Sequence, residues 1–475
     1  MKPIQFISLI LLFVCMISCA NNHNNTTEGS DDIDTTILGG SNAHSTETFE
    51  TGKIITHVIY KTDPAQSYAL YIPAKGNKET LPVVYFFDPH GDGSLPLDKY
   101  KALADVYNFI LVGSNNSKNG NDWSTAENIW NTLFDDTQKR LKINAKRIYL
   151  CGFSGGAKVA TYLALHHNEI KGVIANGAGL PEIIQAGNFN FSFTAIAGEG
   201  DLNMTDLVAI ANGLEHTQTR HRIIFFNGIH EWAPDSTMNI AFEGLQLDAM
   251  QKKITPIDKE FIDNYINISK KTVDAYLKAN NYLKAETECT LATNMLDGSS
   301  NDVNWFREKK VAIQNNPTYQ KQSQEKQKLL ATEQNLKDKY QQQFQQGDMN
   351  YWIKTIKELE AQAKATAPEG AMYQRLEAYL SLAFYSISNQ LIKGNQNNDA
   401  QYFVDLYKLA DPTNSEAWYF SAILDARNNN AKAAEADLLK AVSLGFADKN
   451  RLMQQPEFQQ SGLTINLSEI ENKMK

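Results

Sequence analysis

The sequence predicts an α/β domain with a doubly wound, mostly parallel sheet, followed by an all-α domain. Two observations predict the first domain. Short apolar runs alternate with helical patterns between residues 53 and 252, and residues 83–87 form an unbroken apolar and aromatic run. Such a run suits a strand that is covered on both faces, and strands that alternate with helices imply a parallel sheet with right-handed crossovers. After Thr255 and Pro256, Gly and Pro become rare and the apolar residues follow a helical period, which predicts the second domain.

The elements of the α/β domain are expected in a regular order. The first two strands are separated by Asp63, Pro64 and Ala65, a turn sequence typical of a hairpin. The expected strands cover residues 53–60, 67–71, 81–87, 109–112, 147–151, 172–175, 191–197 and 222–226. The expected helices cover residues 98–107, 124–141, 157–167, 205–216 and 236–252.

A strand, a sharp turn and a helix follow one another at residues 147–160. The apolar run ends at Gly152, and Ser154 stands at the centre of a G-x-S-x-G sequence. In such a turn the serine has a strained backbone and is exposed at the end of the sheet. Small neighbours, here Gly152 and Gly156, let the strand and the helix approach closely. We therefore expect Ser154 to be a catalytic nucleophile; the alternative is a glycine-rich turn without a catalytic role.

Two later residues give the chain order serine, acid, histidine. Asp201 follows the strand at 191–197, and His230 follows the last strand. Loops at the carboxyl ends of parallel strands share one edge of a sheet, so both should lie near Ser154. His230 is expected to take the Ser154 proton, and Asp201 to hold the imidazole. The alternative for Asp201 is a turn or helix cap, and Glu199 on the same loop is the rival acid.

Acyl transfer also needs donors for an oxyanion. Gly155, directly after the nucleophile, is expected to give one backbone N–H, and Gly91 or Asp92 the other, from the loop that follows the strand at 81–87. The same loop has a carboxylate or imidazole side chain at every second position, namely Asp88, His90 and Asp92, and such side chains can bind a metal ion. Carboxylates in a loop of this kind more often accept hydrogen bonds within turns, so no metal is predicted.

Residues from about 80 to 235 resemble the α/β-hydrolase superfamily, and within it the secreted esterases related to polyhydroxybutyrate depolymerases and feruloyl or acetylxylan esterases. Residues 88–91, 152–156, 198–201 and 228–232 carry the resemblance. It implies a serine carboxylesterase that forms an acyl-enzyme on Ser154 without a cofactor. The alternatives are a serine peptidase with the same triad and an envelope interaction protein that keeps the fold without turnover.

The rim of the expected site also carries candidates for binding substrate. These are Asn115, Asn116, Trp123 and Trp232, and a solvated loop is the alternative for the first three. Larger relatives insert a lid before the strand at 191–197, whereas residues 176–190 are too few for a separate cap domain. An open nucleophile favours ester groups on a polysaccharide or another bulky substrate.

The N-terminus has the pattern of a secretory signal. Lys2 is followed by an apolar run at 4–17 and by Ser18, and the run is shorter than the about 20 residues of a membrane span. The segment resembles a bacterial lipoprotein signal, which implies removal of residues 1–18, a lipid on Cys19 and a place in the cell envelope, periplasmic or surface-exposed. An ordinary cleaved signal is the alternative. Residues 19–52 are polar and predict a flexible tether.

Length, charge and cysteine content add further limits. A chain of 475 residues can hold two or three domains. Its net charge of −9, without a basic cluster, argues against a nucleic-acid partner. Cys151 and Cys289 are expected to be buried and unpaired.

The helical domain, expected to cover residues 253–475, contains a repeat. A pattern at 381–414 recurs at 415–448, a period of 34 residues. It resembles the tetratricopeptide repeat, which implies a surface for a protein partner. A scaffold that only braces the first domain, expected at 53–252, is the alternative.

Overall fold

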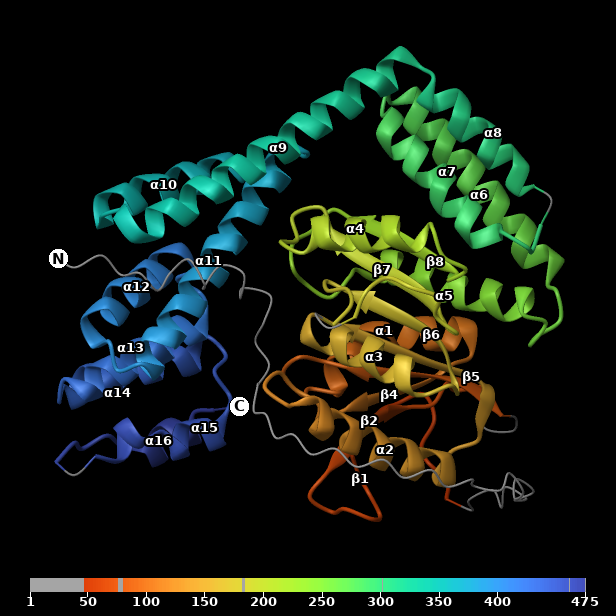
Figure 1. The fold of residues 1–475 in the computed structure, drawn as a ribbon. Coiled ribbons are helices and arrows are strands. Elements are labelled where there is room, and N and C mark those ends of the chain that lie inside the picture. The colour runs from red at the N-terminus through yellow and green to blue at the C-terminus, as the bar shows by residue number, and fades with distance from the viewer. Residues whose placement is uncertain (1–46, 76–79, 182–183, 301, 461, 475) are drawn as a thin grey trace, which may run out of the picture. The chain divides into compact units, whose positions relative to one another are not determined.

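The computed structural model describes residues 47–475 except 76–79, 182–183, 301, 461 and 475 (Figure 1). The predicted signal peptide at 1–18, Cys19 and most of the predicted tether lie outside the described residues. The chain divides into two compact units, and the division falls between residues 327 and 328, within helix α9 (Pro317–Gln346).

An eight-stranded sheet forms the centre of the first unit, in the order β1-β2-β4-β3-β5-β6-β7-β8. β2 pairs antiparallel with both β1 and β4, and all other neighbours are parallel. The prediction of a mostly parallel sheet is therefore confirmed. The strands are β1 (Ile54–Ile59), β2 (Ser67–Tyr71), β3 (Leu81–Phe87), β4 (Ile110–Ser114), β5 (Ile143–Phe153), β6 (Ile170–Asn176), β7 (Ser192–Gly198) and β8 (His221–Phe226).

Helices cover both faces of the sheet (Figure 1). α1 (Ser94–Tyr107) and α5 (Asp235–Gln251) pack on one face, and α2 (Trp123–Arg140), α3 (Gly155–His166) and α4 (Met204–Leu214) pack on the other. Every residue of β3 is buried, because its side chains alternate between the two cores. Phe86 belongs to the core under α1 and α5, whereas Tyr85 and Phe87 belong to the core under α2, α3 and α4.

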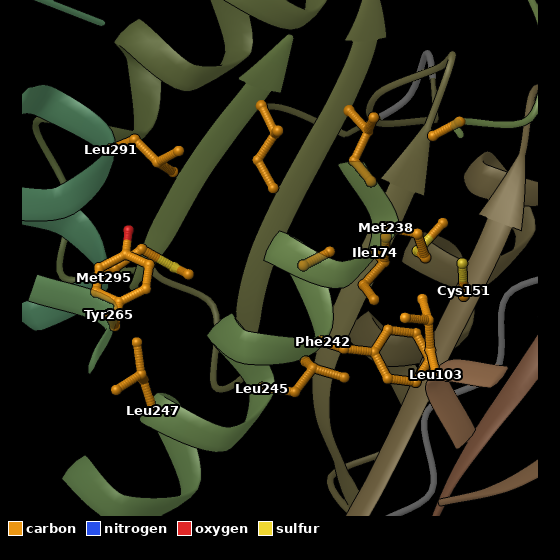
Figure 2. Close-up of a cluster of buried hydrophobic side chains, with 14 of the residues drawn as sticks. Leu103, Cys151, Ile174, Met238, Phe242, Leu245, Leu247, Tyr265, Leu291 and Met295 are labelled. Atoms are coloured by element: carbon orange, nitrogen blue, oxygen red, sulfur yellow. The ribbon is translucent and has the colours of Figure 1, made fainter. Parts of the chain in front are cut away.

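Three further helices belong to the same unit as the sheet: α6 (Lys259–Lys278), α7 (Tyr282–Leu296) and α8 (Val303–Gln314). Their apolar faces extend the core of α1 and α5, and Figure 2 shows Tyr265, Leu291 and Met295 beside Leu247. The helical region expected from residue 253 is thus divided between the two units. Cys151 of β5 and Cys289 of α7 are buried and unpaired, as predicted.

The second unit contains the rest of α9 and a series of shorter helices. The helices are α10 (Met349–Gln362), α11 (Glu369–Lys393), α12 (Asn397–Ala410), α13 (Ser415–Arg427), α14 (Ala431–Ser443), α15 (Lys449–Gln454), the 3-10 helix η2 (Pro456–Gln459) and α16 (Leu467–Asn472). Trp352, Phe384 and Phe420 lie in its core. Helix pairs α11–α12 and α13–α14 correspond to the two predicted copies, although α11 begins well before residue 381. Within the described ranges, no helix combines the length and the apolar character that a membrane crossing requires.

Candidate active site

Ser154 occupies the turn between β5 and α3 and has the strained backbone that the motif predicts. Its φ is 52° and its ψ is −122°. Residues other than Gly rarely adopt this backbone conformation, which costs about 1–3 kcal/mol of folding free energy. Two hydrogen bonds hold the turn. The Ser154 N–H donates to the Asn176 carbonyl at 2.9 Å, and the Ser154 carbonyl accepts from the Ala157 N–H at 3.0 Å.

The neighbouring glycines are required by the close approach of strand and helix. A Cβ on Gly152 would lie 2.1 Å from the Gly156 carbonyl oxygen, and a Cβ on Gly156 would lie 1.9 Å from the Phe87 carbonyl oxygen. Both distances are far inside van der Waals contact with backbone atoms, which cannot rotate away. The sequence motif therefore places Ser154 at the carboxyl end of β5, beside the end of β3.

The structure brings Ser154, His230 and Asp201 together. His230 Nε2 lies 3.0 Å from Ser154 Oγ. His230 Nδ1 lies 3.0 Å from Asp201 Oδ1 and 3.1 Å from Oδ2. The Asp201 side chain is fully buried and that of His230 is 26% exposed, so the imidazole joins an enclosed carboxylate to a hydroxyl near the surface. Asp201 also accepts a hydrogen bond from the Asn203 N–H at 2.8 Å, which fixes the acid loop.

Glu199, the rival acid, has a different partner. Its carboxylate forms an ion pair with Lys284 Nζ of α7 at 3.0 Å. The carboxylate within hydrogen-bond distance of the His230 ring is that of Asp201. Residues 227–234, which carry His230, form the histidine loop. The loop that carries both acids is held against it, because the Gly200 N–H donates to the Gly228 carbonyl at 2.9 Å.

The expected oxyanion donors differ in what the structure allows. Gly155 is the first residue of α3, so its N–H belongs to the first turn, where no carbonyl of the same helix can accept it and where the helix dipole favours negative charge. Gly91 does not fit its predicted role, because its N–H donates to the Asp88 carbonyl at 3.1 Å. The Asp92 side chain lies just before α1, and its Oδ1 accepts from the Ser94 and Leu95 N–H groups at the start of that helix.

Asp88 binds groups of its own loop and of the segment that follows His230. It is 3% exposed and accepts hydrogen bonds from the His90 N–H at 2.8 Å and from Trp232 Nε1 at 2.9 Å. Burial raises the pKa of Asp88, but the hydrogen bonds from His90 and Trp232 outweigh it, so the pKa lies below its ordinary value. In the part of the chain that the structure describes, no group of three or more His, Cys, Asp or Glu side chains could hold a metal ion.

Three of the four substrate-binding candidates have partners within the protein. Trp232 is only 8% exposed and its ring packs against aromatic neighbours in the core. Asn115 accepts from the Gly93 N–H at 3.1 Å and donates to Ser67 Oγ at 2.9 Å. Asn116 accepts from the Ser67 N–H at 3.0 Å. These contacts give Trp232, Asn115 and Asn116 structural roles, and that they bind substrate stays a prediction.

Trp123 keeps a partly exposed side chain at the rim, as Asn115 and Asn116 also do. It begins α2 and stacks on Tyr162 of α3, with ring centroids 4.6 Å apart and planes 20° from parallel. Between β6 and β7, the described residues form no helix.

Sequence reasoning missed Asn176, the last residue of β6. It is fully buried, it accepts the Ser154 N–H, and its side chain binds the segment after His230. The available signal was a single amide after the apolar run at 172–175, directly before Gly177.

No protein-family model and no curated protein sequence matches the chain. Solved structures resemble part of it. An esterase from Pyrobaculum calidifontis is 15% identical, with a TM-score of 0.34, over 43% of this chain and 87% of the esterase. S-formylglutathione hydrolase from Staphylococcus aureus is 11% identical, with a TM-score of 0.33, over 42% of this chain and 99% of that one. A ferulic acid esterase is 14% identical, with a TM-score of 0.32, over 41% and 97%. At these identities and TM-scores the matches assign the chain to no family.

Proposed function

We propose that the chain is a serine hydrolase of the α/β-hydrolase superfamily that cleaves carboxylic esters. The observation that carries the proposal is the hydrogen-bonded series from the Asp201 carboxylate through the His230 imidazole to the Ser154 hydroxyl. This series ends on a serine whose backbone is strained at the N-terminus of a helix. A strained, partly exposed serine within reach of a histidine that an acid orients is the arrangement of an activated nucleophile.

The chemistry follows from the positions of these groups. Ser154 Oγ attacks the ester carbonyl while His230 Nε2 takes its proton, and Asp201 stabilises the imidazolium that forms. The Gly155 N–H, at the start of α3, would bind the oxyanion, and the Asp92 N–H is the proposed second donor. His230 then protonates the leaving alcohol, and water hydrolyses the acyl-enzyme by the reverse proton transfers.

The proposed substrate is an ester group on a polysaccharide or another bulky chain. The support is the short connection between β6 and β7, whose described residues form no helical cap. Trp123, half-buried at the start of α2, offers a flat aromatic surface at the same rim. No step of this mechanism uses a metal or an organic cofactor.

A covalent probe tests the proposal directly. A fluorophosphonate should label the wild-type protein, and peptide mass spectrometry should place the label on Ser154. p-Nitrophenyl acetate should be hydrolysed, and Ser154→Ala should lower kcat by about 10⁴-fold or more. A folded wild-type protein without label or turnover would refute the proposal. Faster cleavage of a matched anilide than of the ester would instead indicate a peptidase.

We also propose that the protein is attached to the cell envelope through a lipid on Cys19, and that the tetratricopeptide-like helices α11–α14 bind a protein partner. The support for the anchor is the signal pattern at residues 1–18. Radioactive palmitate should enter the wild-type protein and not Cys19→Ser. Equal labelling of both would contradict the anchor.

A further inference from the structure

We infer that Asn176 is a positioning residue that holds the histidine loop in register with the nucleophile; the inference rests on the proposed function. Asn176 ends β6 and its side chain is fully buried. A buried amide is costly unless its polar atoms are hydrogen-bonded. Here the amide is satisfied by the two peptide groups on either side of Trp232, directly after His230.

The hydrogen bonds fix the orientation of the amide. Asn176 Oδ1 accepts from the Ala233 N–H at 2.8 Å, and Asn176 Nδ2 donates to the Glu231 carbonyl at 3.2 Å. A backbone N–H can only donate and a carbonyl can only accept, so the reversed amide would place donor against donor and acceptor against acceptor. The position therefore requires a side chain with one acceptor and one donor.

The main chain of the same residue holds the nucleophile. The Asn176 carbonyl accepts from the Ser154 N–H at 2.9 Å, and Asn176 pairs with Phe153 across the parallel strands. Asn176 thus binds the backbone of Ser154 through its main chain and the segment after His230 through its side chain. A side-chain substitution disturbs the histidine side alone, because the bond to Ser154 is made by the backbone.

Two other contacts hold the same loop from different elements. Asp88 accepts from Trp232 Nε1 at 2.9 Å, and the Tyr100 hydroxyl donates to the Ala233 carbonyl at 2.7 Å. These contacts keep the loop folded when the Asn176 amide is lost. The expected defect is therefore a small displacement of His230, and a displacement of about 1 Å at a catalytic group can lower the rate about 10²-fold.

The most informative variant is Asn176→Asp, which keeps the shape and the acceptor for the Ala233 N–H. The ionised carboxylate faces the Glu231 carbonyl with no proton to donate. We expect kcat for p-nitrophenyl acetate to fall about 10²-fold while KM changes less than about threefold. Lowering the pH protonates the new carboxyl, which restores the donor, and burial raises the pKa at which this happens. The ratio of variant to wild-type kcat should therefore rise as the pH falls.

The control is Tyr85→Phe, which removes a buried 2.7 Å hydrogen bond to Thr137 on the other face of the sheet. It should lose comparable stability and keep kcat. A ratio for Asn176→Asp that is near one, or low and independent of pH, would overturn the inference. If Asn176→Asp does not fold, Asn176→Ser carries the kcat test, and a kcat near that of wild type would overturn it. Absence of turnover and of Ser154 labelling in the wild type would refute the proposed function instead.

Discussion

Asp248→Ala should be among the most destabilising single substitutions in the first unit. Asp248 of α5 is 3% exposed and binds two arginines of the β8 region, Arg220 through Oδ1 and Arg222 through Oδ2. Arg220 also donates to the carbonyls of Met295 at 2.6 Å and Asp297 at 2.8 Å, at the end of α7. The carboxylate therefore lies where the sheet, α5 and α7 meet.

The size of the stability loss depends on which hydrogen-bond acceptors Arg220 and Arg222 keep in the variant. Arg220 keeps its two carbonyl acceptors, but the fully buried Arg222 keeps only the Met295 sulfur, 3.2 Å from its guanidinium. Breaking a buried pair on one side costs about 3–5 kcal/mol, since the remaining charge stays desolvated. Against a typical total of about 5–15 kcal/mol, this lowers Tm by on the order of 10 °C for a unit of this size.

Thermal and urea unfolding of the full chain, followed by circular dichroism, measures the loss. Asp98→Ala, which breaks the exposed pair with Lys101, should change stability by less than about 1 kcal/mol. Asp248→Leu combined with Arg222→Met removes both charges and should cost less than Asp248→Ala alone. A loss below about 1 kcal/mol for Asp248→Ala would refute the reasoning.

The same ion cluster predicts a pH dependence. Burial raises the pKa of Asp248, but the charges of Arg222 and Arg220 outweigh it and hold the pKa below the ordinary value. A carboxyl group with a lowered folded pKa stabilises the protein fully above its unfolded pKa, about 3.9, and loses this contribution as the pH falls through the folded value. The stability difference between the wild type and Asp248→Ala should be constant near neutrality and should shrink below about pH 4.

Three further predictions concern the turn at Ser154, the loop that carries His230, and α7. Gly156→Ala places a Cβ 1.9 Å from the Phe87 carbonyl oxygen; it should cost about 1–3 kcal/mol and most of the esterase activity, and wild-type kcat and Tm would contradict the geometry. Trp232→Phe removes the indole donor to Asp88 and should lower kcat by a larger factor than it changes KM. Equal rates of Ser154 labelling by fluorophosphonate in the variant and the wild type would contradict this prediction. Burial raises the pKa of Glu288, so its ionisation destabilises the fold as the pH rises above about 4.5. Glu288→Gln should therefore raise Tm at pH 8 more than at pH 4, and calorimetry at both values checks this.

Sequence reasoning was strongest where the signal is local. The order of strands and helices came from runs of a few residues each, and the strained turn at Ser154 from five consecutive residues. Asp201 and His230 could be placed beside Ser154 because parallel strands align their carboxyl ends, so chain order alone brought their loops to one edge. These predictions require only that the fold is known, and they do not depend on knowing any contact between side chains.

Polar residues on the rim were harder to interpret, because an amide or indole on a loop looks the same whether it faces solvent or its own backbone. Asn115 and Trp232 were expected to contact substrate, and the structure adds partners on distant segments that the sequence did not indicate, Ser67 for the first and Asp88 for the second. The boundary expected at residue 253 had the same weakness. The change of composition there is real, but the apolar faces of α6 and α7 complete the core beneath the sheet.

The residues that position Ser154, Asp201 and His230 are therefore harder to find in the sequence than these three residues themselves. Chemistry restricts the reacting groups to a few residue types in a set chain order, so a motif search finds them. A support needs only a donor or an acceptor at one point in space, and Asn176, Asp88 and Tyr100 meet that need from three different elements. Any polar residue with the right reach could serve, so the sequence carries no pattern for it. Asn176 differs from the other two, because its own backbone binds Ser154 and its side chain is fixed in orientation by two peptide groups. This double constraint makes substitution at Asn176 the sharpest test of whether loop position, and not only the presence of Ser154, Asp201 and His230, sets the rate.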